Sequence, residues 1–453
     1  MNIYMNLEVA VREMDSKLLL AVKAAERGHQ VLIGEEKQID RLRRRYRLAP
    51  GIYHTKSLTP SKQKIELHSA LKAAGFLITS IDEEGGLIDA SYERFARLRY
   101  SEEMLGLADA VFCWGPQDFN QLKSTYADHA HLMRMTGSPR VDLWRPEGKE
   151  YSTRPGDMPR KPYLLVSSNF GVLNNYRNFW DLIRFERNAG YFERDPNYEK
   201  RRYYMASETV VLMYEFVKAI EHLAQEFPDI DIVLRPHPIE RPESWKAMLD
   251  PGFDNVKVTR SGSITPWVHD ALAVMHNGCT TAMEATVSQV PVLTFKPVKQ
   301  QYPREIPNSV GTSVQTRTEL ADALRKVLET SDNTPYKPHP KDVALVEERV
   351  CCRNGVFAAD MMIDCWEELH KDVPSEPNDW NKVVLRQRFR SLKDNLKKWT
   401  GKKSKTSLGH KFPEMRKQDI VEKVEQIRAA GSITSPVGVT MLSGNMFLIS
   451  KDG

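Results

Sequence analysis

The sequence has 453 residues, a length that suits two domains with an extension better than one ordinary domain. A hydrophobic fraction of 41% and a charged fraction of 28% are typical of a soluble globular protein, and no stretch reaches the ~20 apolar residues that span a bilayer. The net charge of +5 comes from the tail, because residues 382–417 hold 13 Lys and Arg against two acids. The body is therefore slightly acidic, which argues against a nucleic-acid-binding surface.

The cysteines and the first residues indicate the compartment. Cys113, Cys279, Cys351, Cys352 and Cys365 form neither a CxxC pair nor a Cys/His spacing typical of a metal site. The first ten residues lack the basic head of a secretory signal. We therefore expect reduced thiols and a cytoplasmic location.

Apolar runs typical of buried strands alternate with helical periodicity over the first third of the chain. The predicted strands cover residues 3–7, 31–33, 52–53, 76–81, 108–114 and 132–135. Helical patterns cover residues 16–27 and 62–74, and a glycine ends each of them. Strands that alternate with helices form a parallel sheet covered on both faces, so residues 1–147 are predicted to be a Rossmann-like domain.

The same pattern restarts after residues 145–161, which are rich in Pro, Gly and charge and are typical of a linker. The predicted strands are 163–166, 230–234, 256–258, 271–275 and 290–295, and the predicted helices are 209–227, 280–288 and 319–329. Residues 160–340 are therefore predicted to form a second Rossmann-like domain, with an aromatic insertion at 171–205 over the cleft. A crossover helix is expected at 341–372 and a basic helical tail at 373–453. The expected fold is α/β, with two doubly wound domains facing a cleft, where ligands of such sheets bind.

Three consecutive carboxylates follow the predicted strand at 76–81. Asp82, Glu83 and Glu84 repel one another at a strand end, and such crowding is expected to raise at least one pKa. A carboxylate in that state can act as general base toward a sugar hydroxyl, and Gly85 and Gly86 would let a substrate approach closely. A solvated acidic turn that caps the next helix is the alternative.

A histidine lies between two prolines where the predicted strand 230–234 ends. Pro236 and Pro238 fix the backbone around His237 and prevent continued strand pairing. His237 can then donate a hydrogen bond to a phosphate oxygen, and Arg235 can add positive charge. A packed, turn-forming histidine is the alternative.

Small polar residues follow two further strands of the second domain. Asn277 and Gly278 turn the chain after residues 271–275, and Thr280 and Thr281 then offer hydroxyls and backbone N–H groups at a helix start, which suits a phosphate. Plain N-capping by Thr280 is the alternative. The strand at 256–258 is followed by three residues that can contact a nucleoside or form an ordinary turn: Ser261, Gly262 and Ser263.

Arg12 and Glu13 come at the first strand–helix junction, which faces the same cleft. Three roles stay open for them: binding an acceptor, organising the acidic loop, or capping the helix with a salt bridge. The chain contains no P-loop, no GxGxxG after the first strand, no GxSxG and no HExxH, and the acidic run lacks the Asp-x-Asp form of a metal–nucleotide site. We therefore expect no required metal and no cofactor.

Six motifs together resemble the bacterial sialyltransferases and capsule Kdo transferases, which are two-domain GT-B enzymes that use CMP-sugars. The resemblance is closer still to surface carbohydrate biosynthesis proteins. The motifs lie at residues 12–19, 82–85, 112–115, 136–140, 235–238 and 276–281. The resemblance implies a GT-B-like glycosyltransferase that moves a Kdo-like or sialic-acid-like sugar from a CMP-activated donor to a surface polysaccharide or a lipid-linked glycan.

The same resemblance implies roles for individual residues. Glu83 or Glu84 would supply the catalytic carboxylate, although Asp82 in front of the pair leaves open which one acts and whether the reaction inverts or retains. His237 would contact the donor phosphate. The donor site would then include these residues: Arg235, Pro238, Ser261, Gly262, Ser263, Asn277, Gly278, Thr280 and Thr281.

An apolar stripe in the basic tail suggests contact with a membrane. Leu385, Phe389, Leu392, Leu396 and Trp399 recur at helical spacing among Arg and Lys side chains. Such a stripe is typical of an interfacial helix, so residues 380–400 are predicted to rest on the inner membrane, where a lipid-linked acceptor would lie. A helix packed on the body and a dimer contact are the alternatives.

Two other functions fit the same sequence. A nucleotide-sugar epimerase of the same fold would rearrange the sugar without an acceptor. A non-catalytic scaffold would bind nucleotide or polysaccharide and tolerate loss of the carboxylates. A nucleic-acid partner is not expected, because the basic tail contains no recognition module.

Overall fold

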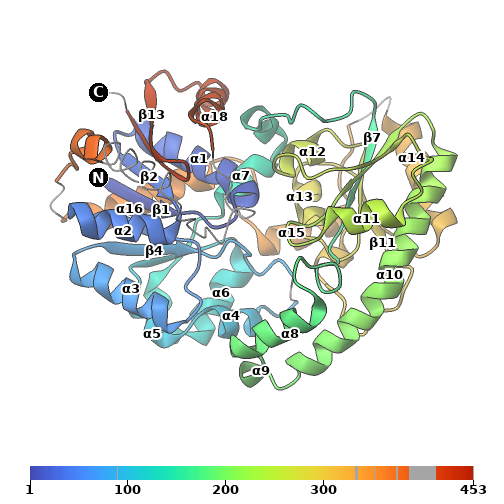
Figure 1. The fold of residues 1–453 in the computed structure, drawn as a ribbon, viewed down its shortest axis with the longest axis horizontal. Helices are drawn as coiled ribbons and strands as arrows, with labels where there is room; N and C mark the ends of the chain where they lie inside the picture. The colour runs from blue at the N-terminus through green and yellow to red at the C-terminus, as the bar shows by residue number, and fades with distance from the viewer. Residues whose placement is uncertain (89, 332–334, 352, 374–375, 387–414, 452–453) are drawn as a thin grey trace, which may run out of the picture.

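The computed structural model describes residues 1–453 apart from 89, 332–334, 352, 374–375, 387–414 and 452–453. It confirms an α/β fold with two lobes, each built on a sheet of its own (Figure 1). Most of the predicted interfacial helix at 380–400 falls outside the described residues. Of the helices that the structure describes, none is both long and apolar enough to span a membrane.

The first sheet has the strand order β13-β14-β2-β1-β3-β4-β5-β6. The strands from β2 to β6 pair in parallel, as the alternating pattern predicted, and β14 joins β2 in the antiparallel direction. The bounds are β1 Asn2–Asn6, β2 Gln30–Gly34, β3 Ile52–Thr55, β4 Leu77–Ile81, β5 Ala110–Cys113, β6 Met133–Met135, β13 Val437–Ser443 and β14 Met446–Lys451.

The second sheet has the order β12-β11-β10-β7-β8-β9 and is parallel throughout. Its strands are β7 Tyr163–Ser167, β8 Asp231–Arg235, β9 Val256–Val258, β10 Ala273–His276, β11 Val292–Phe295 and β12 Thr312–Val314. Successive residues of a strand point to opposite faces, so a parallel strand covered on both sides is apolar along its whole length. In β7, Leu165 accordingly faces one hydrophobic cluster and Leu164 faces another.

Helices cover both sheets on both faces. In the first lobe they are α1 Ala10–Glu26, α2 Glu36–Tyr46, α3 Lys62–Ala73, α4 Glu93–Arg99, α5 Glu102–Leu105, α6 Pro116–Thr125 and α7 Pro139–Trp144, with the 3-10 turns η1 Ala127–Leu132 and η2 Pro146–Tyr151. In the second lobe they are α8 Phe179–Asn188, α9 Tyr191–Arg194, α10 Tyr198–Glu226, α11 Pro242–Met248, α12 Thr265–His269, α13 Thr281–Val287 and α14 Arg317–Ser331, with η3 Pro307–Ser309.

The first helix begins earlier than its periodicity predicted. α1 starts at Ala10 rather than at residue 16, and its N-cap, Val9, makes no side-chain cap. The buried carboxylate of Glu13 instead accepts the backbone N–H groups of Glu8 at 3.0 Å and Val9 at 3.3 Å. An acid inside the first turn thus satisfies the free N–H groups that the sequence pattern assigned to a conventional cap residue.

The segment predicted as one crossover helix contains two helices. α15 covers Pro340–Arg349 and α16 covers Ala358–His370, so the chain leaves the helix between them. Gly355 in that connection has a φ of +72°, a conformation that favours glycine. α15 packs on α13 of the second lobe, and α16 packs on α1 of the first lobe. The chain therefore returns from the second lobe to the first through two helices, not through one continuous helix.

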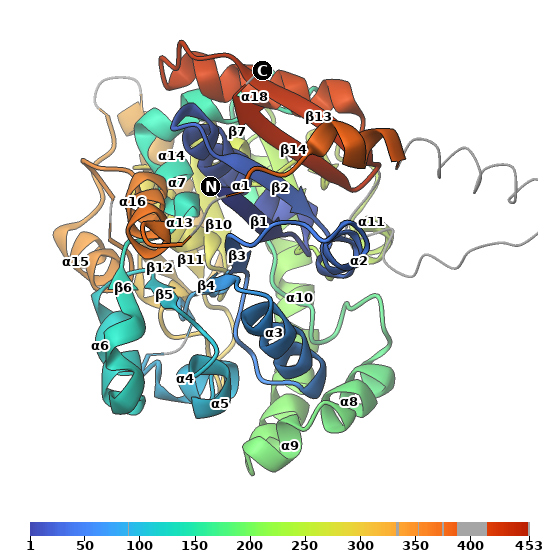
Figure 2. The same ribbon diagram turned by 90° about the vertical axis from the view of Figure 1, so that its left-hand side faces the viewer.

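The tail was predicted to be helical, and its described end is only partly so. α18 (Lys417–Ala430) packs on α1, and the chain then forms the β13–β14 hairpin, which extends the first sheet beyond β2. Figure 2 shows this hairpin in red beside the blue β2 strand. Phe447 and Ile449 are fully buried there, so the hairpin completes the core of the first lobe and protects an otherwise open sheet edge.

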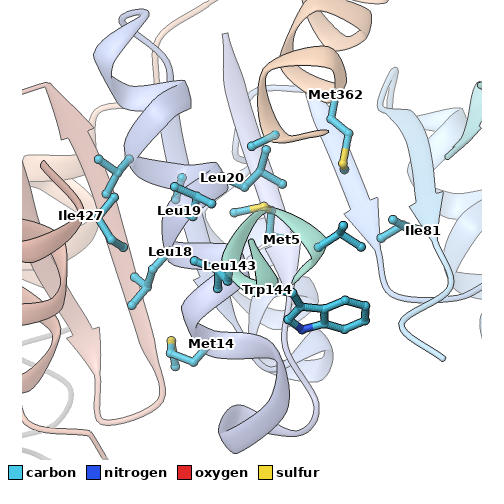
Figure 3. Packing of buried hydrophobic residues seen from close by; sticks show 14 of the residues in the cluster. Met5, Met14, Leu18, Leu19, Leu20, Ile81, Leu143, Trp144, Met362 and Ile427 are labelled. Atoms are coloured by element: carbon cyan, nitrogen blue, oxygen red, sulfur yellow. The ribbon is translucent and has the colours of Figure 1, made fainter. Parts of the chain in front are cut away.

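One hydrophobic cluster extends across both lobes. It contains Met5 and Leu19 from the first sheet and its helix, Val233 and Val274 from the second sheet, and Ile427 from the tail. Figure 3 shows part of it, with α1 packed between the tail helix and α16. The two lobes are therefore held together by apolar packing as well as by the linker.

Candidate functional site

A cavity of about 430 Å³ lies between the lobes, at the carboxyl ends of β7, β8 and β10. Its first-lobe wall comes from the start of α1 and from α7, and includes Arg12, Asp15 and Arg140. Its second-lobe wall comes from the segments that follow these three strands and from the segment after β9. The residues that line it there are Ser167, Ser168, Tyr176, Arg235, Pro236, His237, Pro238, Arg260, Ser263, Ile264, Thr265, Cys279, Thr280, Thr281 and Glu284. The site thus forms where the topology of open parallel sheets places ligands.

Four guanidinium groups line this cavity. Arg235 donates to the carbonyl oxygens of Ser261 at 2.7 Å and Gly262 at 2.8 Å, and its guanidinium lies 4.8 Å from the ring centre of Trp267. Burial lowers the pKa of Arg235 to about 10, so the group remains a cation at neutral pH. The predicted donor-site residues Ser261 and Gly262 therefore orient Arg235 through their carbonyls.

Arg140 forms the cation of the first-lobe wall. Its guanidinium lies 5.5 Å from the ring centres of both Trp114 and Trp144, and it donates to the carbonyl oxygen of Glu83 at 2.8 Å. Burial, with Arg12 as the next influence, lowers the pKa of Arg140. Arg140 was not among the residues predicted from the sequence to form the site. Its position in the Thr136–Arg140 motif after a strand was the available signal.

Arg12 and Arg260 complete the set. Arg12 contacts Glu13 at 3.3 Å and Glu84 at 3.6 Å, which fits the loop-organising role among the three left open for it. Arg260 donates to the Pro238 carbonyl and to the Tyr176 hydroxyl, each at 2.6 Å. Tyr176 is the residue of the predicted 171–205 insertion that reaches the cavity.

His237 lies in the cavity wall as predicted. Its Nδ1 accepts the backbone N–H of Ile239 at 3.3 Å, and the backbone N–H of His237 donates to the Ser168 hydroxyl oxygen at 3.4 Å. Burial, followed by the charge of Arg12, lowers the pKa of His237 to about 4. The imidazole is therefore neutral at physiological pH, with Nδ1 as acceptor and Nε2–H available to donate toward a ligand.

Glu284 is a buried acid of α13 and was not among the residues predicted from the sequence to form the site. Its side chain is 2% exposed, it lines the cavity, and its Oε1 has no hydrogen-bond partner. Burial raises the pKa of Glu284 to about 7, against the opposing effects of Thr265 and Arg140. An acid among apolar neighbours in a short helix was the signal that could have identified it.

The acidic run, Asp82 to Glu84, is paired with neighbouring cations, which offset the repulsion between its three carboxylates. Glu83 forms a buried ion pair with Lys17 at 3.0 Å, and Asp82 accepts two hydrogen bonds from Arg99 at 2.8 and 2.9 Å. Burial alone would raise the pKa of Glu83, but Lys17 and Arg140 outweigh it and the pKa falls. The pKa of Glu84 is lowered as well, because Arg99 and Arg12 outweigh its burial. For Glu83 and Glu84 the expected rise in pKa is therefore wrong.

The two glycines after this run accommodate aromatic rings of the protein itself. A Cβ on Gly85 would lie 2.5 Å from Trp114, and one on Gly86 would lie 1.7 Å from Tyr92; both residues have positive φ. The indole of Trp114 also donates to the Asp82 carbonyl at 2.7 Å. The expectation that these glycines admit a substrate is thus corrected, since the protein's own side chains fill that space.

The turn at residues 277–281, which was predicted to bind a phosphate, differs in structure from the prediction. α13 begins at Thr281 and has seven residues, and the Thr280 side chain does not cap it. The Thr281 hydroxyl lies 3.1 Å from the Ser167 hydroxyl, and Asn277 donates to the Phe295 carbonyl at 2.8 Å. Gly278 has a φ of +67° and donates its N–H to Asn308. Thr280 and Thr281 line the cavity, whereas Asn277 and Gly278 shape the loop behind it.

Asp15 links three parts of the chain at the cavity rim. Its carboxylate accepts from the Ser263 hydroxyl of the second lobe at 2.6 Å and from Lys423 of α18 at 2.5 Å. Burial would raise the pKa of Asp15, but Lys423 outweighs it and the pKa is lowered. The C-terminal segment therefore fixes a residue of the cavity wall.

Across the part of the chain that the structure describes, no three His, Cys, Asp or Glu side chains gather as a metal site would require. The expectation of a metal-free, cofactor-free reaction remains a prediction.

No protein-family model matches the sequence, and a search of curated proteins found no relative. Solved structures do match. A Listeria monocytogenes protein described as a UDP-N-acetylglucosamine 2-epimerase superimposes with a TM-score of 0.50 at 13% identity, over 82% of this chain and 97% of that one. A Neisseria meningitidis UDP-GlcNAc 2-epimerase bound to UDP-GlcNAc gives 0.47 at 10% identity, over 81% and 100%. The wall teichoic acid polymerase TagF gives 0.47 at 11%, over 82% and 89%.

The superposition on the Listeria monocytogenes protein supports the GT-B-like two-lobed fold and corrects the expected function. The predicted transfer of a Kdo-like or sialic-acid-like sugar from a CMP donor is wrong, because that structure is described as a 2-epimerase. The physical reason is that the motifs behind the prediction mark where strands end at the cleft. An acidic run and a His-Pro turn carry no information about the base of the nucleotide or the number of its phosphates.

Proposed function

We propose that this protein binds a nucleoside diphosphate sugar in the cavity between its lobes and epimerises the sugar. The observation that carries the proposal is the lining of that cavity, which combines four arginines with a buried carboxyl group whose Oε1 has no partner. The fold similarity to a 2-epimerase from Listeria monocytogenes supports the class of reaction.

The charge of the cavity suits a diphosphate. Arg12, Arg140, Arg235 and Arg260 line it against two acids, and one of those acids, Asp15, is already paired with Lys423. Guanidinium groups form strong charge-assisted hydrogen bonds with phosphate oxygens, and an enclosed site strengthens them. Neutral His237 adds a donor without adding charge.

Glu284 suits the ribose. A buried carboxylate oxygen without a partner is costly, and two adjacent hydroxyl groups of a ribose are donors that would satisfy it. Glu284 lies in the same wall as Arg235, so one ligand can reach both residues. The base would then face the loop of residues 261–263 and the sugar would extend toward His237 and the acidic run.

Epimerisation removes a proton from one face of a sugar carbon and returns a proton to the opposite face, either the one removed or one exchanged with solvent. Glu84 is the proposed proton acceptor. It is the half-exposed member of the acidic run, and its lowered pKa keeps it ionised. It is paired with Arg12, a residue of the cavity wall, and its charge acts on His237.

Two experiments test the proposal: a measurement of nucleotide binding and an assay for epimerisation. Calorimetric titrations would compare UDP, UDP-GlcNAc, CDP and CMP with the wild type, with Glu284→Gln, and with Glu329→Gln as a matched exposed control. We expect UDP and UDP-GlcNAc to bind, and Glu284→Gln to weaken both by roughly ten- to hundredfold through loss of a charge-assisted acceptor. Incubation with a panel of UDP-hexoses in D2O would then be followed by NMR, since proton removal at the inverted carbon incorporates deuterium.

Deuterium incorporation with a second epimer, lost in Glu84→Gln and His237→Ala, would support the proposal. Tight binding without incorporation would replace the epimerase by a nucleotide-binding scaffold. Binding of CMP alone, or of no nucleotide, would overturn the proposal altogether.

A further inference from the structure

A long apolar stripe on α10 is exposed to solvent, and none of its residues lines the cavity. α10 runs along the outer side of the second lobe, away from the chain ends (Figure 1). One face of this helix is buried against the second sheet through Leu212, Phe216 and Ile220. Its other face carries large side chains that are 39–53% exposed, namely Tyr203, Tyr204, Val210, Val211 and Tyr214.

The stripe is symmetric about Ser207. Tyr203 and Val211 lie four residues on either side of it, Tyr204 and Val210 lie three residues away, and Lys200 and Tyr214 lie seven away. At 100° per residue these seven positions fall within about 120° of the helix circumference, so they share one face. When a second copy approaches antiparallel, a face with symmetric positions brings tyrosines of one copy level with valines of the other.

Two-fold symmetry makes use of such a face. In a two-fold dimer each residue meets its counterpart at the mirrored position, so two copies of α10 centred on Ser207 would place Tyr203 against Val211 and Tyr204 against Val210. The small Ser207 at the centre lets the helix backbones approach closely. Apolar side chains that water now contacts would be buried on both copies.

Opposite charges at the two ends of the stripe would pair between the two copies. Glu215 lies at the margin of the stripe, one residue beyond Tyr214. In the antiparallel pairing the exposed Lys200 of one copy lies level with Glu215 of the other, and the symmetry repeats the pair. Glu199, Glu208 and Glu215 flank the stripe, which disfavours contact with an anionic lipid surface.

The apolar surface continues onto α8. Trp180 is 64% exposed, and its ring centre lies 6.3 Å from that of Tyr203. Contiguous exposed patches that contain Trp and Tyr are typical of protein interfaces rather than of free surface. We propose that a second copy of this chain docks on this surface, with α10 packed antiparallel on α10 around Ser207.

The experiment measures mass by light scattering during size-exclusion chromatography, over a roughly hundredfold range of concentration, because a dimer dissociates by mass action. The wild type is expected to shift toward twice the chain mass as concentration rises. Val211→Glu is expected to remain a monomer. Val356→Glu alters a side chain that is 62% exposed elsewhere and is the matched control, expected to behave as the wild type.

Four further variants test the geometry of the α10–α10 pairing. Lys200→Glu and Glu215→Lys are each expected to weaken the dimer, and the double variant, which restores opposite charges across the pair, is expected to recover it. Ser207→Cys is expected to form a disulfide-linked dimer on mild oxidation, since two-fold symmetry brings both positions to the axis. The wild type, with its native cysteines, sets the background for that reaction.

A wild type that stays monomeric throughout would overturn the proposal. A dimer that survives Val211→Glu and gives no cross-link through Ser207→Cys would place the interface elsewhere and overturn it too. Binding of the monomer to lipid vesicles, abolished by Val211→Glu, would replace the second copy by a membrane.

Discussion

Glu284 is one of three buried acids, with Asp118 and Asp142, whose pKa burial raises to about 7. Burial raises its pKa from 4.5 to about 7, so folding takes up a proton between those pH values. The contribution of Glu284 to the free energy of unfolding should therefore fall as the pH rises from 4.5 to about 7, by on the order of 3 kcal/mol, and then level off. Urea denaturation of the ligand-free protein at a series of pH values measures this slope.

Glu284→Gln should remove that part of the slope, because the amide does not titrate, whereas Glu329→Gln should leave it unchanged. A slope that is identical in the wild type and Glu284→Gln would contradict the raised pKa.

The ion pair of Lys17 and Glu83 is a second residue-level test. The two side chains are 3% and 6% exposed, so the pair lies out of water. Lys17→Met leaves the Glu83 carboxylate buried without its nearest cation and should lower the free energy of unfolding by about 3 kcal/mol. The double variant Lys17→Met with Glu83→Gln should lose less, since no unpaired charge remains. Chemical denaturation measures both.

The exposed pair of Arg97 and Glu93 provides the control. Its side chains are 66% and 53% exposed, so Arg97→Met should change stability by less than about 1 kcal/mol. Equal losses for Lys17→Met and the double variant would show that packing of the lysine, and not the stranded charge, causes the effect.

The C-terminal helix acts on the cavity through one contact. Lys423 of α18 binds Asp15, which in turn binds Ser263 of the second lobe. Because the two charges are partly buried, a double-mutant cycle with Lys423→Met and Asp15→Asn should give a coupling energy of about 1–2 kcal/mol. A cycle of Arg428→Met with Glu425→Gln, a pair within α18, is the control and should give about 0.5 kcal/mol or less.

The sequence predicted some helices and strands correctly and missed others. The buried parallel strands were identified, because strands covered on both faces are apolar throughout. The start of α1 was missed, since its cap is the interior acid Glu13. The β13–β14 hairpin was also missed, although two apolar runs around Ser443-Gly444-Asn445 are a hairpin signal. A strand at the far end of the chain gives no indication that it pairs with β2.

The molecule as a whole should unfold as one unit. Its largest hydrophobic cluster joins Met5, Val233 and Ile427, so neither lobe has a core that is complete without the other. A large apolar interface couples domains, and we therefore expect a single calorimetric transition despite two sheets. Tryptophan emission from Trp144 and Trp245 should change together with the far-ultraviolet circular dichroism. Two separate transitions would contradict this coupling.

By itself the sequence determined the two α/β units, the linker between them and the strand ends where polar residues gather. These features depend on local hydrophobic periodicity and on the residues that end helices and strands. Both can be identified from neighbouring residues in the sequence. His237 and Arg235 were located in the cleft for that reason.

The tertiary structure alone decided which charges meet. Lys17 neutralises Glu83, Arg99 holds Asp82, and Glu284 becomes a buried acid of the cavity wall. Pairings over such separations depend on how helices pack on sheets, and a pKa depends on the burial and charge that packing creates. The proposal of a nucleoside diphosphate sugar rests on that three-dimensional lining, which the order of residues along the chain does not contain.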